Sequence, residues 1–258
     1  MDILRTLQET FLDFDAMGQA LPELLKVGLP NTLLLALCSA VLGTVAGMLL
    51  AVAGLSRSRW LRWPARVYTD IFRGLPAAVT ILLIGVGLAP VGLAVWGPNP
   101  FPLGILALSL IGSAYIGEIF RSGIQSVESG QLEAARALGF SRPIAMRLVV
   151  IPQGVRRVLP ALVNQFIALI KESSLVYFLG LLATQRDLFR IGQDQAANTG
   201  NESALLLAGL FYLIITVPLT HVVNHIDSRL RTGSHEDDGV DLSGDDLAVA
   251  VAVTAGSR

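Results

Sequence analysis

Thirty consecutive residues without a charged side chain, from Val27 to Ser56, limit what this chain can fold into more than any other feature. A hydrocarbon core of about 30 Å is crossed by roughly 20 apolar helical residues, so this run is long enough to span a membrane. Small side chains within the run would let a neighbouring helix approach closely in lipid. They are Ala36, Ala40, Gly43 and Gly47. The run therefore predicts a closely packed transmembrane helix.

The composition of the 258 residues agrees with a lipid environment. Hydrophobic residues make up 53% of the chain and charged residues only 15%, whereas about a quarter of a soluble domain is charged. The formal net charge of −1 gives no reason to expect a nucleic-acid partner. The only cysteine in the sequence is Cys38, which lies in an apolar run. A single cysteine excludes a disulfide within the chain and a cysteine-based metal site.

Further apolar blocks follow the first. The uncharged run 74–117 is too long for one helix and contains three prolines within residues 97–102, so we predict two helices, 66–89 and 103–120. The block 158–185 is interrupted by the polar residues 171–174, and the block 203–226 is again long enough to span. The sequence therefore predicts an all-α membrane protein with five transmembrane helices, in a domain over residues 21–231.

The basic residues outside these helices predict the orientation. Five spans place successive loops on alternate sides, and the side richer in lysine and arginine is cytoplasmic. One side holds twelve basic residues: Arg57, Arg59, Arg62, Arg66, Arg121, Arg136, Arg142, Arg147, Arg156, Arg157, Arg229 and Arg231. The other side holds four: Arg5, Lys26, Arg186 and Arg190. We therefore expect the N-terminus outside and the C-terminus in the cytoplasm.

The two ends of the chain differ in character from the spans. Residues 1–20 are predicted to form a periplasmic or extracellular segment, and residues 1–19 lack the apolar stretch of a cleavable signal. Residues 233–258 are predicted to form a disordered acidic cytoplasmic tail, because their like charges repel one another. The acids of this tail are Glu236, Asp237, Asp238, Asp241, Asp245 and Asp246.

The longest loop on the basic side, residues 121–156, predicts two short helices lying under the membrane. Residues 132–138 favour a helix, and Gly139 can end it in a left-handed conformation. Ser141 and Pro143 can open a second helix, which we expect to end at Pro152. The small alanines of the first helix suit a groove on a partner protein. The residues alone equally allow an amphipathic helix on the membrane surface.

The loop contains Glu133-Ala134-Ala135, then Gly139, then residues 149–152 (VVIP). In its residues and spacing this pattern resembles the EAA motif of ABC importer permeases. The family pattern is E-A-A, three residues, G, nine residues and I-x-L-P. Here Val149 replaces the isoleucine and Ile151 the leucine. The resemblance implies a coupling helix seated in a cleft of an ATPase subunit. The candidate coupling residues are Glu133, Ala134, Ala135, Gly139 and Pro152.

Other segments resemble the polar amino acid permeases of the histidine, glutamine and arginine type. They are 72–76 (FRGLP), 114–127, 152–153 and 171–175 (KESSL), with Leu75, Gly154, Glu172 and Ser173 departing from the usual residues. The resemblance implies the type I ABC importer permease fold in a bacterial cytoplasmic (inner) membrane. It also implies three kinds of partner: ATPase subunits, an extracytoplasmic solute-binding protein and a second permease chain, identical or related. The chain would bind no ATP itself, since it has no Walker A pattern.

Two other functions remain open at this point. An ABC permease could carry another small solute, such as a compatible solute or a non-polar amino acid. A secondary transporter or a membrane scaffold would need no ATPase, and the EAA spacing argues against both.

Polar residues near the spans are candidates for the translocation path or a gate. Lys171, Glu172 and Ser173 interrupt a span, where ionisable groups usually face a cavity or each other; the alternative is an ion pair that fixes a kink. Glu118 and Arg121 are a candidate inner gate or a helix-end pair. Asn31 and Thr32 are candidates for an outer substrate contact or for hydrogen bonds that hold a helix.

The remaining candidates point to structure. His221 and His225 lie one helical turn apart, but no third metal ligand is evident, so we predict no metal site and no cofactor. The cluster Arg57, Arg59, Arg62 and Arg66 is predicted to anchor the chain at the membrane and to contact anionic lipid.

Overall fold

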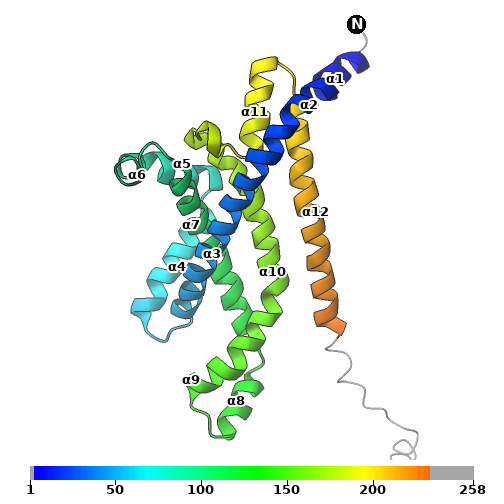
Figure 1. The fold of residues 1–258 in the computed structure, drawn as a ribbon. Coiled ribbons are helices and arrows are strands. Elements are labelled where there is room, and N and C mark those ends of the chain that lie inside the picture. Colours follow the sequence, from blue (N-terminus) through cyan, green and yellow to red (C-terminus); the bar gives the residue numbers. More distant parts are fainter. Residues whose placement is uncertain (1–2, 233–258) are drawn as a thin grey trace, which may run out of the picture.

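The computed structural model describes residues 3–232, and this part of the chain is helical with no strand. Four long helices build the bundle in Figure 1: α3 (Leu29–Gly54), α7 (Phe101–Gln125), α10 (Ile151–Glu172) and α12 (Ser203–Thr232). The short helices α8 and α9 lie at one end of the bundle, and α11 and α1 lie at the opposite end. The predicted acidic tail, 233–258, falls outside the described residues.

Four helical stretches are long and apolar enough to cross a membrane, and a bent pair would make a fifth. The pair is α4 (Arg59–Gly74) and α5 (Ala77–Gly87), which meet at 107°. The prediction of one straight helix over 66–89 is therefore wrong. Leu75 precedes Pro76 and is extended, with φ −83° and ψ 140°, because a residue before proline avoids the helical conformation.

The N-terminal segment is helical and runs into the first long helix. It consists of α1 (Ile3–Phe11), α2 (Phe14–Glu23) and a wide π-helical turn, Leu24–Gly28. Asp13 caps α2, because its carboxylate accepts hydrogen bonds from the backbone N–H groups of Asp15 at 3.0 Å and Ala16 at 3.1 Å. Residues 3–20 are thus helical except at Leu12 and Asp13.

Glycines let α3 and α7 pack with their backbones in close approach, as the sequence predicts. A Cβ atom added to Gly47 would lie 2.9 Å from the backbone nitrogen of Gly117, and one added to Gly43 would lie 3.3 Å from that of Ser113. Helix α7 also packs against α4, α5 and α10, so it is the central helix of the bundle. The buried side chains around it include Leu35, Ile81, Leu108, Leu169 and Val176.

A second close crossing joins α7 to α10. A Cβ atom added to Gly123 would lie 2.7 Å from the carbonyl oxygen of Gly154, and one added to Gly154 would lie 2.9 Å from that of Gly123. Gly154 is one of the positions that depart from the amino acid permease pattern, where alanine is usual. The absence of a side chain there permits this contact.

The predicted end of the second loop helix at Pro152 is wrong. Helix α9 (Arg142–Ala145) continues through a π-helical turn, Met146–Val150, into α10 without a break. In that turn the N–H of Ile151 bonds the carbonyl of Met146, five residues back. The wider turn accommodates the hydrogen bond that Pro152 cannot donate, so the helix continues.

The C-terminal end of α10 leads into a less regular region. A 3₁₀-helix, Ser173–Leu179, follows α10 directly, and a shorter one, Ala183–Gln185, precedes α11 (Leu188–Thr199). The predicted interruption at 171–174 is therefore confirmed as a change of helix type. Helix α6 (Ala89–Trp96) lies beside α5 at the same end of the bundle.

Candidate functional site

The loop with the E-A-A pattern forms two helices joined by a tight turn. Helix α8 (Ser129–Ala137) ends at Gly139, whose φ of +89° is left-handed. The N–H of Phe140 bonds the carbonyl of Ala135 at 3.2 Å, and the N–H of Gly139 bonds that of Arg136 at 3.0 Å. These two bonds define a Schellman motif, in which glycine is strongly preferred. The predicted role of Gly139 as the helix stop is confirmed.

The predicted coupling residues divide between an outer and an inner face of this loop. Glu133, Ala134, Gly139 and Pro152 are exposed, whereas Ala135 is buried. Ala135 therefore faces the protein and cannot contact a partner directly. The loop also exposes large apolar side chains, which are Leu138, Phe140, Ile144 and Leu148. A water-facing loop gains nothing from such residues unless another protein or the membrane covers them.

The loop is packed firmly against the C-terminal end of α7 and the N-terminal end of α10. Ile124, Val127 and Val150 form a buried cluster with Leu132 and Met146 against it. Two hydrogen bonds run between the loop and α10. The side-chain amide of Gln153 donates to that of Gln131 at 3.3 Å, and the guanidinium of Arg157 donates to the carbonyl of Ser126. A displacement of α8 would therefore be transmitted to α7 and α10.

The predicted pair of Glu118 and Arg121 forms on α7. The guanidinium of Arg121 donates two hydrogen bonds to the Glu118 carboxylate, one of them 2.9 Å long from Nε, and a third to Gln125 at 2.7 Å. The pair borders a cavity of about 180 Å³ between α3, α4 and α7. Three other charged side chains line this cavity: Arg66, Asp70 and Arg73.

Lys171, Glu172 and Ser173 lie at the C-terminal end of α10, where the 3₁₀-helix begins, not within the middle of a helix. Lys171 is exposed and Glu172 is half-buried, and no ion pair joins them in the described chain. The buried Ser173 hydroxyl donates to the carbonyl of Ile170 at 2.7 Å. One carboxylate oxygen of Glu172 is buried without a hydrogen-bond partner. The alternative of a Lys171–Glu172 ion pair is therefore wrong.

Asn31 and Thr32 hold the segment that precedes α11. The side-chain amide of Asn31 donates to the carbonyls of Thr184 and Arg186, both at 3.0 Å. Thr32 is fully buried, and its hydroxyl accepts from the N–H of Leu188 at 3.1 Å. Both side chains thus make the hydrogen bonds that the structural alternative predicts.

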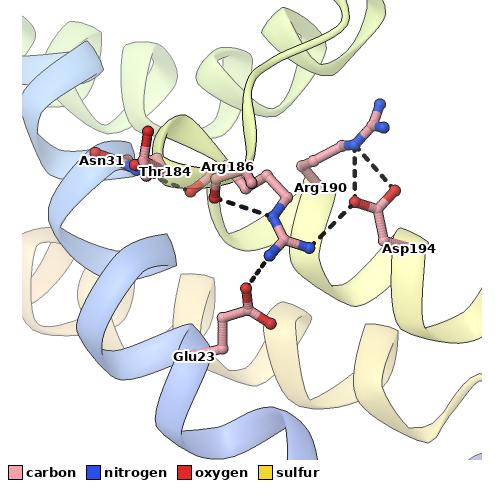
Figure 2. A network of polar contacts seen from close by, with 7 residues as sticks. Glu23, Asn31, Thr184, Arg186, Arg190 and Asp194 are labelled. Atoms are coloured by element: carbon pink, nitrogen blue, oxygen red, sulfur yellow. Dashed lines mark hydrogen bonds and ion pairs between the residues drawn. The ribbon is translucent and has the colours of Figure 1, made fainter.

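A network of charged side chains joins α2 to α11, and the sequence did not predict it. Figure 2 shows the guanidinium of Arg186 between Glu23 of α2 and Asp194 of α11. Asp194 also accepts from Arg190, at 2.9 and 3.0 Å. The network joins residues more than 160 positions apart in the chain. Only the charge of each residue was visible in the sequence, and its partners were not.

Asp187 is a second group that the sequence did not single out. Its side chain is fully buried and accepts hydrogen bonds from the N–H of Arg190 at 2.9 Å and the hydroxyl of Tyr212 at 3.2 Å. Burial raises the pKa of the Asp187 carboxyl to about 6, and these hydrogen bonds offset only part of that effect. Asp187 also caps the N-terminus of α11.

Residues 3–232 contain no cluster of histidine, cysteine or carboxylate side chains suited to a metal ion. His221 and His225 both lie on α12. The features that remain are a bundle of membrane-length helices, two polar regions at its ends and one exposed two-helix loop. This combination is typical of a polytopic membrane protein with one exposed surface suited to contact with another protein or with the membrane.

Comparison with known families identifies the subunit. Residues 43–232 match the family described as the binding-protein-dependent transport system inner membrane component, and the chain belongs to this family. It is a transport subunit, not an enzyme, and it has the type I ABC importer permease fold.

Individual relatives agree over nearly their full length. The arginine transport system permease protein ArtQ of Bacillus subtilis is 34% identical over 221 residues, covering 86% of this chain and 98% of the relative. The glutamate/aspartate import permease protein GltK of Escherichia coli O157:H7 is 34% identical over 223 residues, covering 84% and 97%.

Solved structures give the same fold. An amino acid ABC transporter, crystallised with histidines, has a chain with a TM-score of 0.74 and 32% identity, covering 84% of this chain and 99% of that one. The MetNI methionine ABC transporter, in an inward-facing form, has a TM-score of 0.65 at 19% identity, covering 77% and 92%, and shares the fold.

Proposed function

We propose that this chain pairs with a second permease chain, identical or related, and forms the translocation path of an ATP-driven importer of polar amino acids. The cargo is supported by the relatives, which are named for arginine and for glutamate and aspartate. The polar amino acid motifs at 72–76 and 171–175 support the same cargo. The energy comes from ATPase subunits, and an extracytoplasmic solute-binding protein delivers the solute.

Energy coupling is assigned to α8 and its turn, with Glu133, Ala134 and Gly139 facing the ATPase. The observation that carries this assignment is the pairing of an exposed apolar surface with rigid attachment. Leu138 is 80% exposed, whereas the opposite side of the loop packs on α7 and α10. ATP-driven closure of the ATPases would push on this loop and rock the long helices around a central path.

The orientation follows from this assignment. The ATPases are cytoplasmic, so the end of the bundle with α8 and α9 faces the cytoplasm of the bacterial inner membrane. The opposite end, with α1 and α11, then faces outside, where the binding protein docks. The excess of arginine on the α8 side supports the same orientation.

The translocation path is assigned to the polar groups that the bundle leaves unpaired or facing a cavity. Glu172 at the outer end has a buried carboxylate oxygen without a partner, which suits the ammonium group of an amino acid. Lys171 and Ser173 flank it. Glu118 and Arg121 border the inner cavity and would act as the inner gate. Asn31 and Thr32 position residues 184–188 at the outer end of the path through their hydrogen bonds.

The coupling assignment is tested by Gly139→Val. A β-branched residue resists the left-handed conformation at φ +89°, so the Schellman turn should be lost. We expect solute uptake to fall at least tenfold while the amount of protein in the membrane is unchanged. Gly130→Val is the matched control, because Gly130 lies in the same loop with open space around its Cβ and no positive φ. Normal uptake by Gly139→Val contradicts the assignment.

The partners and cargo are tested by purification from native membranes in mild detergent, with every co-purifying protein identified. Recovery of an ATPase and a solute-binding protein supports the importer. The binding protein is then titrated with amino acids and with compatible solutes. Recovery of this chain alone, also after crosslinking, favours a secondary transporter.

A further inference from the structure

Arg57 and the first two turns of α4 carry a concentration of arginine and tryptophan, of which only Arg66 also lines the cavity beside Glu118 and Arg121. Residues 57–66 contain four arginines, and no acidic residue lies between Lys26 and Asp70. In the described part of the chain, none of the four arginines forms an ion pair or a side-chain hydrogen bond. They are Arg57, Arg59, Arg62 and Arg66.

These side chains share one surface of the helix. At 100° per residue, Arg59, Arg62 and Arg66 lie within a 60° arc, and Trp63 and Trp60 continue that arc on one side. Trp60 is 90% exposed and Trp63 is 69% exposed. An open groove of about 660 Å³ is lined by Arg59, Trp60, Arg62, Trp63, Pro64 and Arg66.

The opposite side of α4 fixes the groove on the bundle. Ala65 is buried, and the Tyr68 hydroxyl donates to the carbonyl of Leu110 at 3.0 Å and lies 2.7 Å from the hydroxyl of Ser113. Helix α4 therefore lies at the edge of the bundle, attached to α7 (Figure 1). Arg59, Arg66 and both tryptophans are exposed on it. No side chain caps the N-terminus of the helix at Ser58, so backbone N–H groups there are free for an anion.

We propose that this groove is a binding site for the headgroup of an anionic phospholipid of the cytoplasmic leaflet. Guanidinium groups bind phosphate through paired hydrogen bonds. Tryptophan rings prefer the boundary between headgroup and acyl chains, with the apolar face toward the chains. The three arginines that line the groove form no ion pair in the described chain, and their positive charge selects an anionic lipid over a zwitterionic one. The site is a selective headgroup contact, which goes beyond general anchoring of the chain in the bilayer.

Tryptophan fluorescence can test the site directly, because the chain has only three tryptophans. Trp96→Phe removes the one outside the groove and leaves Trp60 and Trp63 as reporters. The full-length protein is reconstituted in phosphatidylcholine vesicles doped with brominated phosphatidylglycerol or, at the same mole fraction, brominated phosphatidylcholine. We expect the phosphatidylglycerol analogue to quench more strongly, with a preference of about fivefold for each arginine that contacts the headgroup.

Two double variants identify the cause of the preference. Arg59→Gln with Arg62→Gln should abolish it, so that both lipids quench equally. Arg142→Gln with Arg147→Gln removes the same charge from exposed positions outside the groove and should leave the preference intact.

Three results would overturn the proposal. Equal quenching by both lipids in the Trp96→Phe protein would show no selectivity. Absence of quenching by either lipid would mean that protein, such as a second permease chain, covers the groove. Loss of the preference on adding soluble glycerol phosphate would assign the groove to a free phosphate ester and not to a lipid.

Discussion

Glu172 is the residue whose surroundings most directly suggest contact with a solute. A carboxylate oxygen that is buried without a partner is costly, and an ammonium group from a passing amino acid would satisfy it. We expect Glu172→Gln to raise the transport KM by about 10-fold or more, since a charged hydrogen bond contributes about 1.5–3 kcal/mol. Glu9→Gln is the control, because it removes a carboxylate that is 65% exposed and lies outside the assigned path. An unchanged KM in Glu172→Gln would remove this residue from the path.

Asp187 should make the stability of the protein depend on pH. Its folded-state pKa of about 6 lies above the value of about 3.9 in an unfolded chain. The folded state therefore binds more protons between these values, and its stability should fall by about 3 kcal/mol as pH rises from about 4 to about 6, then stay level.

The variant Asp187→Asn isolates this effect, because asparagine also caps a helix but cannot ionise. Its thermal unfolding midpoint in detergent should lose the fall between about pH 4 and about pH 6 and should lie above that of the parent at neutral pH. If the unfolding midpoints of the two proteins changed with pH in parallel, ionisation of Asp187 would have no effect on stability.

For single residues, the sequence predicts contacts between near neighbours in the chain and does not reveal contacts with residues of other helices. The stop at Gly139 and the pair of Glu118 and Arg121 depend on neighbours within five residues, so they could be predicted. The partners of Asp187 and Arg186 come from other helices, and nothing in the local sequence specifies them. The carboxylate of Glu172 could be identified as a candidate, but its lack of a partner could not.

The pairing of α3 with α7 depends on glycine at the contact. We expect Gly47→Ala to lower the free energy of unfolding by about 1–3 kcal/mol, because the added Cβ would lie 2.9 Å from backbone atoms that cannot rotate away. Gly209→Ala on α12 is the control, since its Cβ would meet nothing within 4 Å. The thermal unfolding midpoints of both variants in detergent give the comparison. Equal midpoints would mean that the two helices separate at little cost.

Prolines show why helix bounds were harder to predict than helices. Pro76 separates α4 from α5 at a sharp angle, whereas Pro152 lies inside a continuous helix. The rule that a helix avoids the position before proline applies to Leu75. It fails before Pro152, because the π-helical turn supplies a different hydrogen-bond pattern. That turn depends on how α9 packs, which the sequence does not reveal.

The whole molecule has a firmly connected region at each end of its long helices. At the outer end, Arg186 joins α2 to α11 (Figure 2). At the inner end, a buried cluster joins the α8 loop to α7 and α10. The all-helical bundle could be predicted from runs of apolar residues. These two connections could not, because they join segments far apart in the chain.

The outer connection should hold α11 in place independently of the inner loop. We expect Arg186→Ala to speed amide hydrogen exchange several-fold over residues 183–199 and to leave residues 129–145 unchanged, because only the outer ion pairs are lost. Arg5→Ala is the control. It removes the Arg5–Glu9 pair, whose side chains are 82% and 65% exposed, and should affect α1 alone. Unchanged exchange over α11 in Arg186→Ala would show that apolar packing is sufficient.

The π-helical turn before α10 also sets the direction in which the coupling loop points. Such a turn contains one residue more than an α-helix of the same rise. Because the wide turn absorbs this extra residue, it keeps α9 in place about the axis of α10; in a regular α-helix of the same sequence the extra residue would rotate α9, and α8 with it, by about 100°. Every residue of the E-A-A pattern would then be present, but the pattern would face another direction. The nine-residue spacing between Gly139 and Val149, together with the wide turn, therefore sets the direction in which α8 and α9 point as well as their distance from α10.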